Sequence, residues 1–341
     1  PEPCHTPSPL CYNSYPMDPP TFLKVVYEPV SIELKAVYTT VNALWTDALR
    51  LVYDDNLELK STQGKLLRPA MCLLSAGAIG AQDLHRFVDL AATFEMLHLA
   101  ALVHDDVVDS ADIRRGTRSL NALWDDHAAV LGGDYLVARA TSLLTPYDSC
   151  PLIACVVDSV RQMAEGELRS IRRNANTFSE DDCIQLARQK TASLFAACCV
   201  GPTYLIDTPH RLALERYGLG FGTAFQLSDD ILDLAQTEEK LGKPSCGDVS
   251  EGKATLPLRF MRDGLDPDDT ARLDAMRGAA ISEQDRAWVA KTLERTGARG
   301  QTEAIAHRYV DNARKALDEL PESPYRRSLT ALLDFVLTRG S

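Results

Sequence analysis

Apolar residues recur at intervals of three and four along most of the chain, from about Thr21 onward. In the first such stretch they stand at Val37, Val41, Leu44 and Leu51, which is the spacing of one face of an α-helix. Further stretches of this kind, rich in Ala and Leu, lie at 65–80, 83–104, 119–144, 151–171, 180–205, 210–234 and 255–263. Alternation of β-branched with polar residues is scarce, and there is no Asn-Gly hairpin turn. The pattern predicts an all-α protein, a bundle of roughly ten or more helices.

The polarity of the stretches predicts where each lies in the bundle. Two of them, 89–104 and 191–205, are apolar on nearly every face, which is typical of helices at the centre of a large bundle. After Asp263 the pattern becomes more amphipathic and charged, so we expect a peripheral C-terminal lobe. No break in composition marks a second domain, and we expect residues 21–341 to form one helical domain. Residues 1–20 hold seven prolines and are predicted to be a flexible leader.

Charge and cysteine content narrow the class of protein. The chain has 341 residues with 36 Lys+Arg and 48 Asp+Glu, a formal charge of −12, which argues against nucleic acid as the main partner. The nine cysteines show no repeated short spacing and are interpreted as reduced thiols, although Cys4, His5 and Cys11 could suggest a metal clip. No run reaches the roughly 18 apolar residues of a membrane span, and no signal-peptide pattern opens the chain. We therefore expect a cytoplasmic protein without a transmembrane segment.

Two aspartate motifs are the strongest candidates for chemistry. Of six pairs of adjacent aspartates only two continue as Asp-Asp-x-x-Asp, and their members are Asp105, Asp106 and Asp109, and Asp229, Asp230 and Asp233. Each motif follows an apolar stretch, where an ionised carboxylate costs several kcal/mol unless it is paired or metal-bound. Residues i and i+4 lie about 6 Å apart on one helix face, so two opposed motifs would offer hard oxygen ligands suited to Mg²⁺. The alternative, a glycosidase with paired carboxylates, needs neither the additional aspartates nor the cations described next.

Basic residues flank both motifs. They are Lys65, Arg68, Arg114, Arg115, Lys190, Lys243 and Lys253. Lys65 and Arg68 are predicted to share one helical face near a helix start, as a phosphate clamp requires. Each of these cations alone would be a solvated surface charge in most proteins, but their common position beside two metal-type motifs indicates a ligand with several phosphate charges. No Walker-type Gly-rich loop is present, which argues against a P-loop nucleotide enzyme.

In this order, the motifs resemble those of trans-isoprenyl diphosphate synthases, the polyprenyl synthetase family. The resemblance runs from about Gly64 to Pro257 and includes, besides the aspartate motifs, Gly64-Lys65-x-x-Arg68-Pro69, Glu95-x-x-His98, Arg114-Arg115-Gly116, Gly133-Asp134-Tyr135, Gly166-Glu167, Lys190-Thr191-Ala192, Phe225-Gln226, Gly242-Lys243-Pro244 and Gly252-Lys253. It implies a helical bundle around a deep central cavity, a homodimer, and Mg²⁺-dependent condensation of isopentenyl diphosphate with geranyl, farnesyl or geranylgeranyl diphosphate. Three Mg²⁺ per active site are expected by the same resemblance.

The resemblance also implies a role for each matching residue. The aspartates hold Mg²⁺ on the allylic diphosphate, with Asp233 in support. The residues that clamp this diphosphate are Arg114, Lys190 and Lys253, with Lys243 close by. Those that hold the diphosphate of isopentenyl diphosphate are Lys65, Arg68, His98 and Arg115, and those that face the developing allylic cation are Thr191 and Gln226. One departure is visible, because Ser170 stands where the family often has Gln.

Product length should depend on residues below the first motif on its own helix. Ala100 and Ala101 stand five and four residues before Asp105, where bulky aromatic residues in this family stop growth at short products. The next candidates for a tunnel floor are Met96, Leu97, Thr93 and Phe94, with Leu136 and Leu143 on a neighbouring helix. One helical turn rises about 5.4 Å, close to one isoprene unit. We expect a linear product of four or more units, in the long-chain class.

Three other interpretations stay open. A farnesyl or geranylgeranyl diphosphate synthase would differ only in product length. A terpene cyclase shares the first aspartate motif but needs no second diphosphate site, which Lys65, Arg68 and His98 indicate. A non-catalytic partner subunit would be expected to lose aspartates from one motif, whereas both motifs are complete here. Neither His98 nor His104 is expected to act as an acid or base, because a neutral hydrogen-bonding role suits both.

Overall fold

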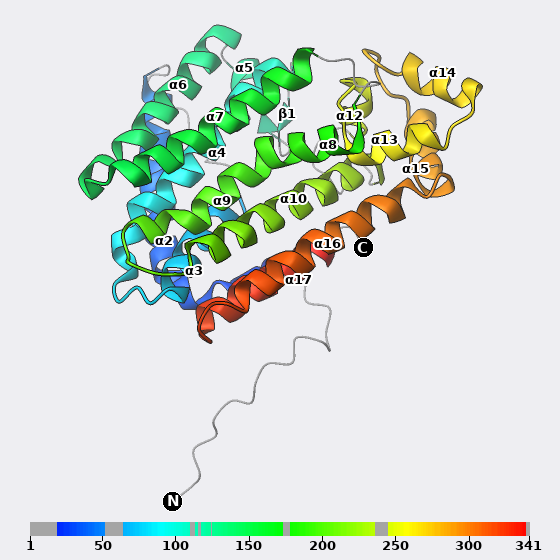
Figure 1. Ribbon diagram of the computed structural model, residues 1–341. Helices are drawn as coiled ribbons and strands as arrows, with labels where there is room; N and C mark the ends of the chain where they lie inside the picture. The colour runs from blue at the N-terminus through cyan, green and yellow to red at the C-terminus, as the bar shows by residue number, and fades with distance from the viewer. Residues whose placement is uncertain are drawn as a thin grey trace, which may run out of the picture.

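A computed structural model describes residues 19–51, 64–109, 113–114, 117–123, 125–172, 178–235 and 245–338. The α-helices are α1 (Pro19–Val26), α2 (Ser31–Arg50), α3 (Leu67–Ala78), α4 (Val88–Val108), α5 (Leu120–Leu123), α6 (Asp126–Ser142), α7 (Cys150–Arg172), α8 (Glu180–Ala187), α9 (Ser193–Val200), α10 (Arg211–Ala235), α12 (Gly247–Ser250), α13 (Leu256–Asp263), α14 (Pro267–Ala275), α15 (Glu283–Arg295), α16 (Ala298–Leu317) and α17 (Pro324–Thr338). In the described ranges, strand structure is limited to the antiparallel pair β1 (Ile113–Arg114) and β2 (Thr117–Arg118). The prediction of an all-α fold is confirmed (Figure 1).

Short helical segments of other kinds join the α-helices. They are the 3₁₀ segments η1 (Glu28–Val30), η2 (Leu84–Phe87), η3 (Thr145–Tyr147) and η6 (Gly201–Tyr204), and one π-helical turn, η5 (Arg188–Ala192). The π turn links α8 directly to α9, so the stretch 180–205 is nearly continuous rather than one regular helix. π turns inside α-helices are rare and occur frequently at functional sites.

The centre of the bundle is formed by α4, α9 and α10. Every residue of α9 is buried, and most of α4 is, as the all-round apolar pattern predicts. Helix α10 lies directly against α9 and the π turn η5 because glycine stands at two contact positions. A Cβ on Gly218 would lie 2.6 Å from Ala196 Cα of α9, and one on Gly222 would lie 2.5 Å from Ala192 Cα of η5. Figure 1 shows α9 and α10 side by side through the middle of the molecule. This packing positions α10, the helix that carries the second aspartate motif.

The segment Leu84–Val108, which contains α4, is long and apolar enough to cross a membrane by length and composition, with a hydropathy of 1.3. In the structure 72% of its most apolar window is buried inside the bundle. A central helix of a bundle passes the same test, because it too is apolar on most faces. The length and hydropathy of this segment are therefore only weak evidence that it spans a membrane.

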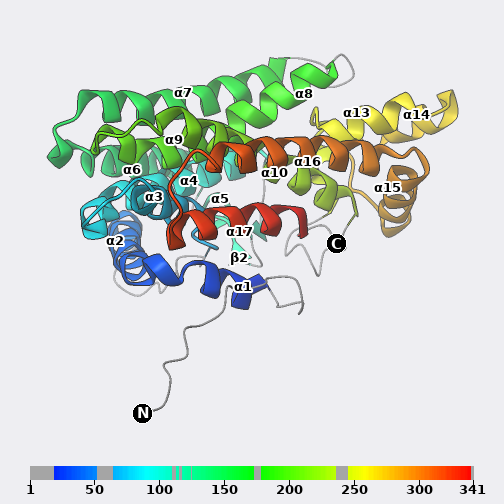
Figure 2. The ribbon, with the colours of Figure 1, turned by 60° about the horizontal axis from the view of Figure 1, so that its bottom comes forward.

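The expected peripheral C-terminal lobe is wrong for α16 and α17. Helix α16 lies along α10, and α17 packs against α3 with Leu329, Leu332 and Val336 fully buried in the main core. Helices α14 and α15 are peripheral: together with α12 and α13 they enclose a second, smaller cluster around Leu273 and Val289 at one end of the bundle (Figure 2). An amphipathic helix has an apolar face whether it packs on the main core or on a smaller cluster. The charged residues on the other faces of α16 and α17 were therefore wrongly interpreted as a sign of a peripheral position.

Candidate active site

The first aspartate motif stands at the C-terminal end of α4. Asp105 and Asp106 lie in its last turn, and Asp109 follows as the C-cap, with its N–H donating to the Asp105 carbonyl over 2.8 Å. Asp106 is buried, whereas the side chains of Asp105 and Asp109 are 26% and 19% exposed. The four-residue spacing places these last two on one face of the helix end, as predicted.

The second motif occupies the last two turns of α10. Asp230 and Asp233 are buried, and Asp229 is half-buried. Asp233 accepts from the backbone N–H of Asp248 at 3.0 Å, and its own carbonyl accepts from Cys246 at 2.9 Å. Asp233 therefore anchors the segment that begins α12.

Asp230 is tied to the π turn through a chain of polar contacts. Its carboxylate accepts from Gln226 Nε2 at 2.7 Å, and Gln226 Oε1 in turn accepts from the Thr191 hydroxyl at 2.5 Å. Burial raises the pKa of Asp230 to about 7, against the Gln226 hydrogen bond, which lowers it. The two residues expected to face the allylic cation, Thr191 and Gln226, are thus in direct contact with each other beside the second motif.

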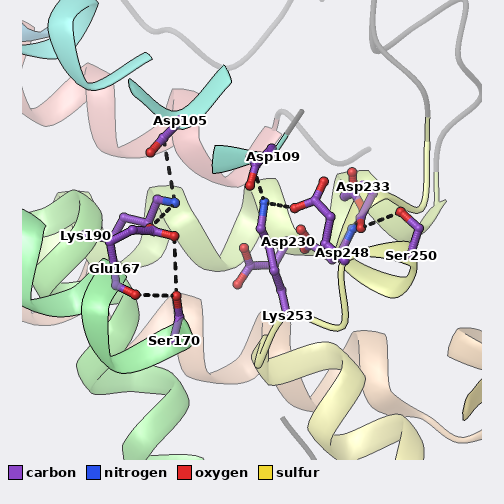
Figure 3. A network of polar contacts seen from close by, with 12 residues as sticks. Asp105, Asp109, Glu167, Ser170, Lys190, Asp230, Asp233, Asp248, Ser250 and Lys253 are labelled. Atoms are coloured by element: carbon purple, nitrogen blue, oxygen red, sulfur yellow. Dashed lines mark hydrogen bonds and ion pairs between the residues drawn. The ribbon is translucent and has the colours of Figure 1, made fainter. Parts of the chain in front are cut away.

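Two lysines contact the carboxylates of the first motif (Figure 3). Lys190 Nζ, from the π turn, lies 3.6 Å from Asp105 Oδ2 and donates to Glu167 Oε2 over 2.6 Å. Lys253 Nζ lies 3.2 Å from Asp109 Oδ2 and forms an ion pair with Glu251. The lysines belong to segments far from α4 in the sequence, and they meet the two carboxylates one helical turn apart.

The electrostatic environment keeps both lysines charged. Burial opposes the charge of Lys190, but the carboxylates of Asp105 and Glu167 outweigh it and raise its pKa. Burial also opposes the charge of Lys253, and its carboxylate neighbours, of which Asp248 and Asp109 act most strongly, raise its pKa well above the ordinary value. The site therefore holds two fixed ammonium groups next to a motif of metal-ligand type.

Lys65 and Arg68 differ from the prediction in one respect. Helix α3 begins at Leu67, so Arg68 lies in its first turn, whereas Lys65 precedes the helix and does not share its face. The intervening Leu66 is left-handed, with φ 49°, and this turns the backbone at the helix start. Lys65 Nζ lies 5.3 Å from the centroid of the Phe335 ring, and the Arg68 guanidinium lies 4.4 Å from that of Phe195.

The two histidines of α4 are half-buried. His98 stands seven residues before Asp105, about two turns along the same face. His104 Nε2 lies 3.2 Å from the Val130 carbonyl and 3.5 Å from Asp134 Oδ1, which gives it the hydrogen-bonding contacts expected of it. A Cβ on Gly133 would lie 2.1 Å from His104 Nε2, so glycine there is what allows α6 to lie against this ring.

The residues proposed to limit product length all lie in the core around α4. Ala100, Leu97, Met96 and Leu136 are buried, and Ala101 and Leu143 are half-buried. Thr93 faces α6, because its hydroxyl donates to the Ala140 carbonyl at 3.2 Å. Phe94 lies against η6, where a Cβ on Gly201 would be 3.3 Å from its ring. Phe94 and Ala101 share the helix face of Asp105.

Other predicted residues lie beyond the described parts of the chain. Arg115 and Lys243 are among them, as are Cys4, His5 and Cys11. For Arg114 the structure describes the backbone, in β1.

Sequence reasoning missed two acidic partners of the lysines. Glu167 was recognised only as part of a Gly-Glu motif, and Glu251 was not singled out, yet each contacts a lysine of the site. Gly166 next to Glu167 lies against the π turn, where its added Cβ would be 3.0 Å from Gln189 Cβ. The motif at 166–167 was therefore the available signal for Glu167. Ser170, the departure from the family pattern, donates to the Glu167 carbonyl over 2.7 Å.

The donor set suits a hard divalent cation that keeps other ligands. Among the described residues no three His, Cys, Asp or Glu side chains converge closely enough to hold a metal ion by themselves. The two motifs nevertheless provide buried carboxylates, Asp106, Asp230 and Asp233, which are costly unless they are paired or bind a cation. Mg²⁺ typically takes one or two carboxylates and completes its shell with water and substrate phosphates. The arrangement fits that mode of binding.

Comparisons with known proteins agree with this geometry. A model of the family described as polyprenyl synthetase matches residues 49–294. The all-trans-nonaprenyl-diphosphate synthase (geranyl-diphosphate specific) of Rhodobacter capsulatus is 36% identical over 323 residues, 93% of this chain and 98% of that protein. Heptaprenyl diphosphate synthase component 2 of Geobacillus stearothermophilus is 31% identical over 318 residues, 92% of this chain and 98% of that protein. The crystal structure of a polyprenyl synthase from Caulobacter crescentus, complexed with calcium and isoprenyl diphosphate, superposes with a TM-score of 0.83 at 32% identity, covering 94% of this chain and 98% of that one.

Proposed function

The chain belongs to the polyprenyl synthetase family, and from this premise we propose which residues carry the reaction and how far the product grows. It is a prenyltransferase that condenses isopentenyl diphosphate with an allylic diphosphate to a linear polyprenyl diphosphate. The observation that carries the residue assignment is the contact of Lys190 and Lys253 with the first aspartate motif, beside the buried second motif.

The six aspartates of the two motifs are the residues that would hold Mg²⁺, three ions per site by analogy with the family. When bound, the metal neutralises charge on the diphosphate that leaves the allylic substrate. Lys190 and Lys253 carry fixed positive charges to the same place, where preorganised cations stabilise the developing charge without reorganising. Arg114 and Lys243 are proposed to join them.

The reaction itself needs no side-chain nucleophile. The allylic C–O bond breaks and its electron pair stays on the diphosphate, after which the isopentenyl double bond attacks the allylic carbon. Thr191 and Gln226 present oxygen atoms beside Asp230, where partial negative charge would stabilise the cation. The attack forms the new carbon–carbon bond and leaves a cation at C3 of the isopentenyl unit, and a proton lost from its C2 passes to the released diphosphate as the new double bond forms. Burial of all of α9 and most of α4 supports a site from which water is excluded.

Lys65, Arg68, His98 and Arg115 are proposed to bind the diphosphate of isopentenyl diphosphate. Lys65 and Arg68 stand at the start of α3, where backbone N–H groups and two cations favour an anion. His98 is proposed to join them from α4, because α4 packs against α3.

For product length we propose the long-chain class. The relatives named above are a nonaprenyl and a heptaprenyl synthase, and Ala100 and Ala101 leave the space below Asp105 without a bulky side chain. Leu97, Met96 and, deeper on the face of Asp105, Phe94 are the residues that would next limit growth.

We propose that the chain forms a homodimer. Helix α6 exposes Val130 and Leu131, and helix α7 exposes Val157 and Leu168, which are large apolar side chains that a partner could cover. The relative named component 2 raises a second arrangement, an unlike partner subunit. Light scattering of the purified chain, alone, distinguishes the two: a homodimer at working concentrations is expected, and a monomer without activity would favour the unlike partner.

Mass spectrometry of the products tests the proposal directly. Purified protein with Mg²⁺, isopentenyl diphosphate and farnesyl diphosphate should give a ladder of linear prenyl diphosphates, whose longest member locates the tunnel floor. Products that stop at geranylgeranyl diphosphate would contradict the long-chain assignment. Cyclic products from farnesyl diphosphate alone would contradict the reaction.

A further inference from the structure

Lys65 is held at both its backbone and its side chain by residues from the two ends of the chain. The hydroxyl of Tyr27, just after α1, donates to the Lys65 carbonyl over 2.8 Å. The ring of Phe335, on α17, lies 5.3 Å from Lys65 Nζ. These contacts join positions that are far apart in sequence, so they form only when both terminal helices are docked.

The Phe335 ring is itself fixed in place. It is 3% exposed, and it stacks on Phe22 of α1 with ring centroids 6.0 Å apart and planes 9° from parallel. Helix α17 also packs along α3, the helix that follows Lys65. Phe335 is therefore a rigid surface on which a mobile lysine side chain can rest, because a buried ring loses no further freedom when it makes the contact.

The backbone at this point needs such support. Leu66 has φ 49° and ψ 35°, a left-handed conformation that a residue with a side chain adopts at a cost. Such backbone conformations persist only where surrounding contacts enforce them. The Tyr27 hydroxyl holds the carbonyl immediately before Leu66, so it holds the turn that aims Lys65.

From these contacts we propose that Tyr27 and Phe335 are positioning residues for Lys65 and so set the affinity of the enzyme for isopentenyl diphosphate. The inference rests on the proposed role of Lys65 in binding that diphosphate. A ring attracts an ammonium through its quadrupole and brings no negative charge that an incoming diphosphate would have to displace. Phe335 thus orders Lys65 without adding a negative charge beside it, and α1 and α17 support the substrate site without touching the substrate.

The first test replaces the ring with an aliphatic side chain. Phe335→Leu should raise KM for isopentenyl diphosphate about two- to five-fold, as expected for a cation–π contact at an exposed cation, with kcat and the KM for farnesyl diphosphate nearly unchanged. Phe335→Tyr, which keeps the ring, should restore the KM. Phe87→Leu is the matched control, because Phe87 is also buried but stands about 27 Å from Asp105 along α4.

The second test removes the hydroxyl that holds the backbone. Tyr27→Phe should raise the same KM about two- to five-fold, since a net hydrogen bond is worth about that factor in an equilibrium. Tyr147→Phe is the control, because the Tyr147 hydroxyl likewise donates to a backbone carbonyl, that of Arg86, over 2.6 Å, and it also accepts from the Leu90 N–H over 3.1 Å, so this variant loses at least as many hydrogen bonds. If the Tyr27 and Tyr147 variants changed the KM for isopentenyl diphosphate equally, both changes would be attributed to lost stability of the fold, and the proposal would be overturned.

A double-mutant cycle separates this inference from the function on which it rests. Lys65→Met should itself raise KM for isopentenyl diphosphate, and Phe335→Leu added to it should have no further effect. An unchanged KM in Lys65→Met would overturn the assignment of Lys65 to the substrate. A raised KM in Lys65→Met with an unaltered KM in Phe335→Leu, or additive effects in the double variant, would leave that assignment standing and overturn only the role of Phe335.

Discussion

The cations of the site are held in two different ways. Beside the aspartate motifs both lysines contact carboxylates: Lys190 Nζ lies 2.6 Å from Glu167 Oε2, and Lys253 Nζ lies 3.2 Å from Asp109 Oδ2. At the start of α3, Lys65 and Arg68 lie over aromatic rings. A carboxylate partner competes with a diphosphate for the ammonium, whereas a ring does not.

The difference matches the two diphosphates that the enzyme must handle. Asp105 and Asp109 contact Lys190 and Lys253 and are also the proposed Mg²⁺ ligands, so the positions of these two lysines are linked to the carboxylates that would hold the metal. The cations on rings have their position fixed by packing of α17 and α9, so they depend on the fold rather than on the metal.

The largest expected effect comes from removing a carboxylate of either motif. Asp105→Ala or Asp229→Ala should lower kcat by about 10³-fold or more, because charge on the leaving diphosphate would no longer be neutralised. Circular dichroism should show the helical fold intact in both. Asp268→Ala, which removes one of another pair of adjacent aspartates on the exposed face of α14, should keep full activity. Wild-type turnover in the Asp105 or Asp229 variant would refute the metal assignment.

Removing a lysine from the carboxylate side should have the next largest effect. Lys190→Met should lower kcat by about 10²-fold, the usual loss when one preorganised charge is removed from a transition state. Steady-state kinetics should show that excess Mg²⁺ does not restore the rate. Lys291→Met, at an exposed position of α15, is the matched control. If Lys190→Met changed only the KM for isopentenyl diphosphate, Lys190 would act like Lys65 and Arg68. The proposed division between the two pairs of cations would then be wrong.

A third prediction concerns the space below the first motif. Ala101→Phe should shorten the longest product, because Ala101 lies one turn below Asp105 on the same helix face and a phenyl ring there would block the growing chain. Liquid chromatography with mass spectrometry of the products measures the change. Ala287→Phe adds the same ring at an exposed site of α15 and should leave the product distribution unaltered. An unchanged distribution in the Ala101 variant would place the floor elsewhere.

The sequence predicted the parts of this site that follow from local spacing. The i, i+4 aspartates at the ends of apolar stretches, and the cations around them, were identified from pattern alone. The contact of Lys253 with Asp109 spans 144 positions, and no local pattern encodes such a meeting. The role of α17 was missed for a related reason: its buried stripe is visible in the sequence, but the helix against which that stripe packs is not.

The left-handed Leu66 shows a second limit. Leucine gives no signal for a positive φ, which glycine or asparagine would have given, so the helical stretch was predicted to begin at Lys65. Tertiary contacts from residues 27 and 335 reach Lys65, the residue just before this turn, and a sequence pattern does not encode them.

The smallest expected effect concerns Ser170, which contacts Glu167, the carboxylate partner of Lys190. The Ser170 hydroxyl donates to the Glu167 carbonyl over 2.7 Å and lies 3.4 Å from Glu167 Oε1, so its main bond is to the backbone of its own helix. Ser170→Ala should therefore change kcat by less than about two-fold, because the bond that is lost is made to the backbone of its own helix and not to Lys190. Glu167→Gln, which keeps the shape but removes the charge opposite Lys190, should change kcat more. The opposite result would be loss of activity in Ser170→Ala with activity kept in Glu167→Gln. It would mean that the shape of α7, rather than the charge of Glu167, positions Lys190. Lys190 and Lys65 would then no longer differ in whether a negative charge holds them.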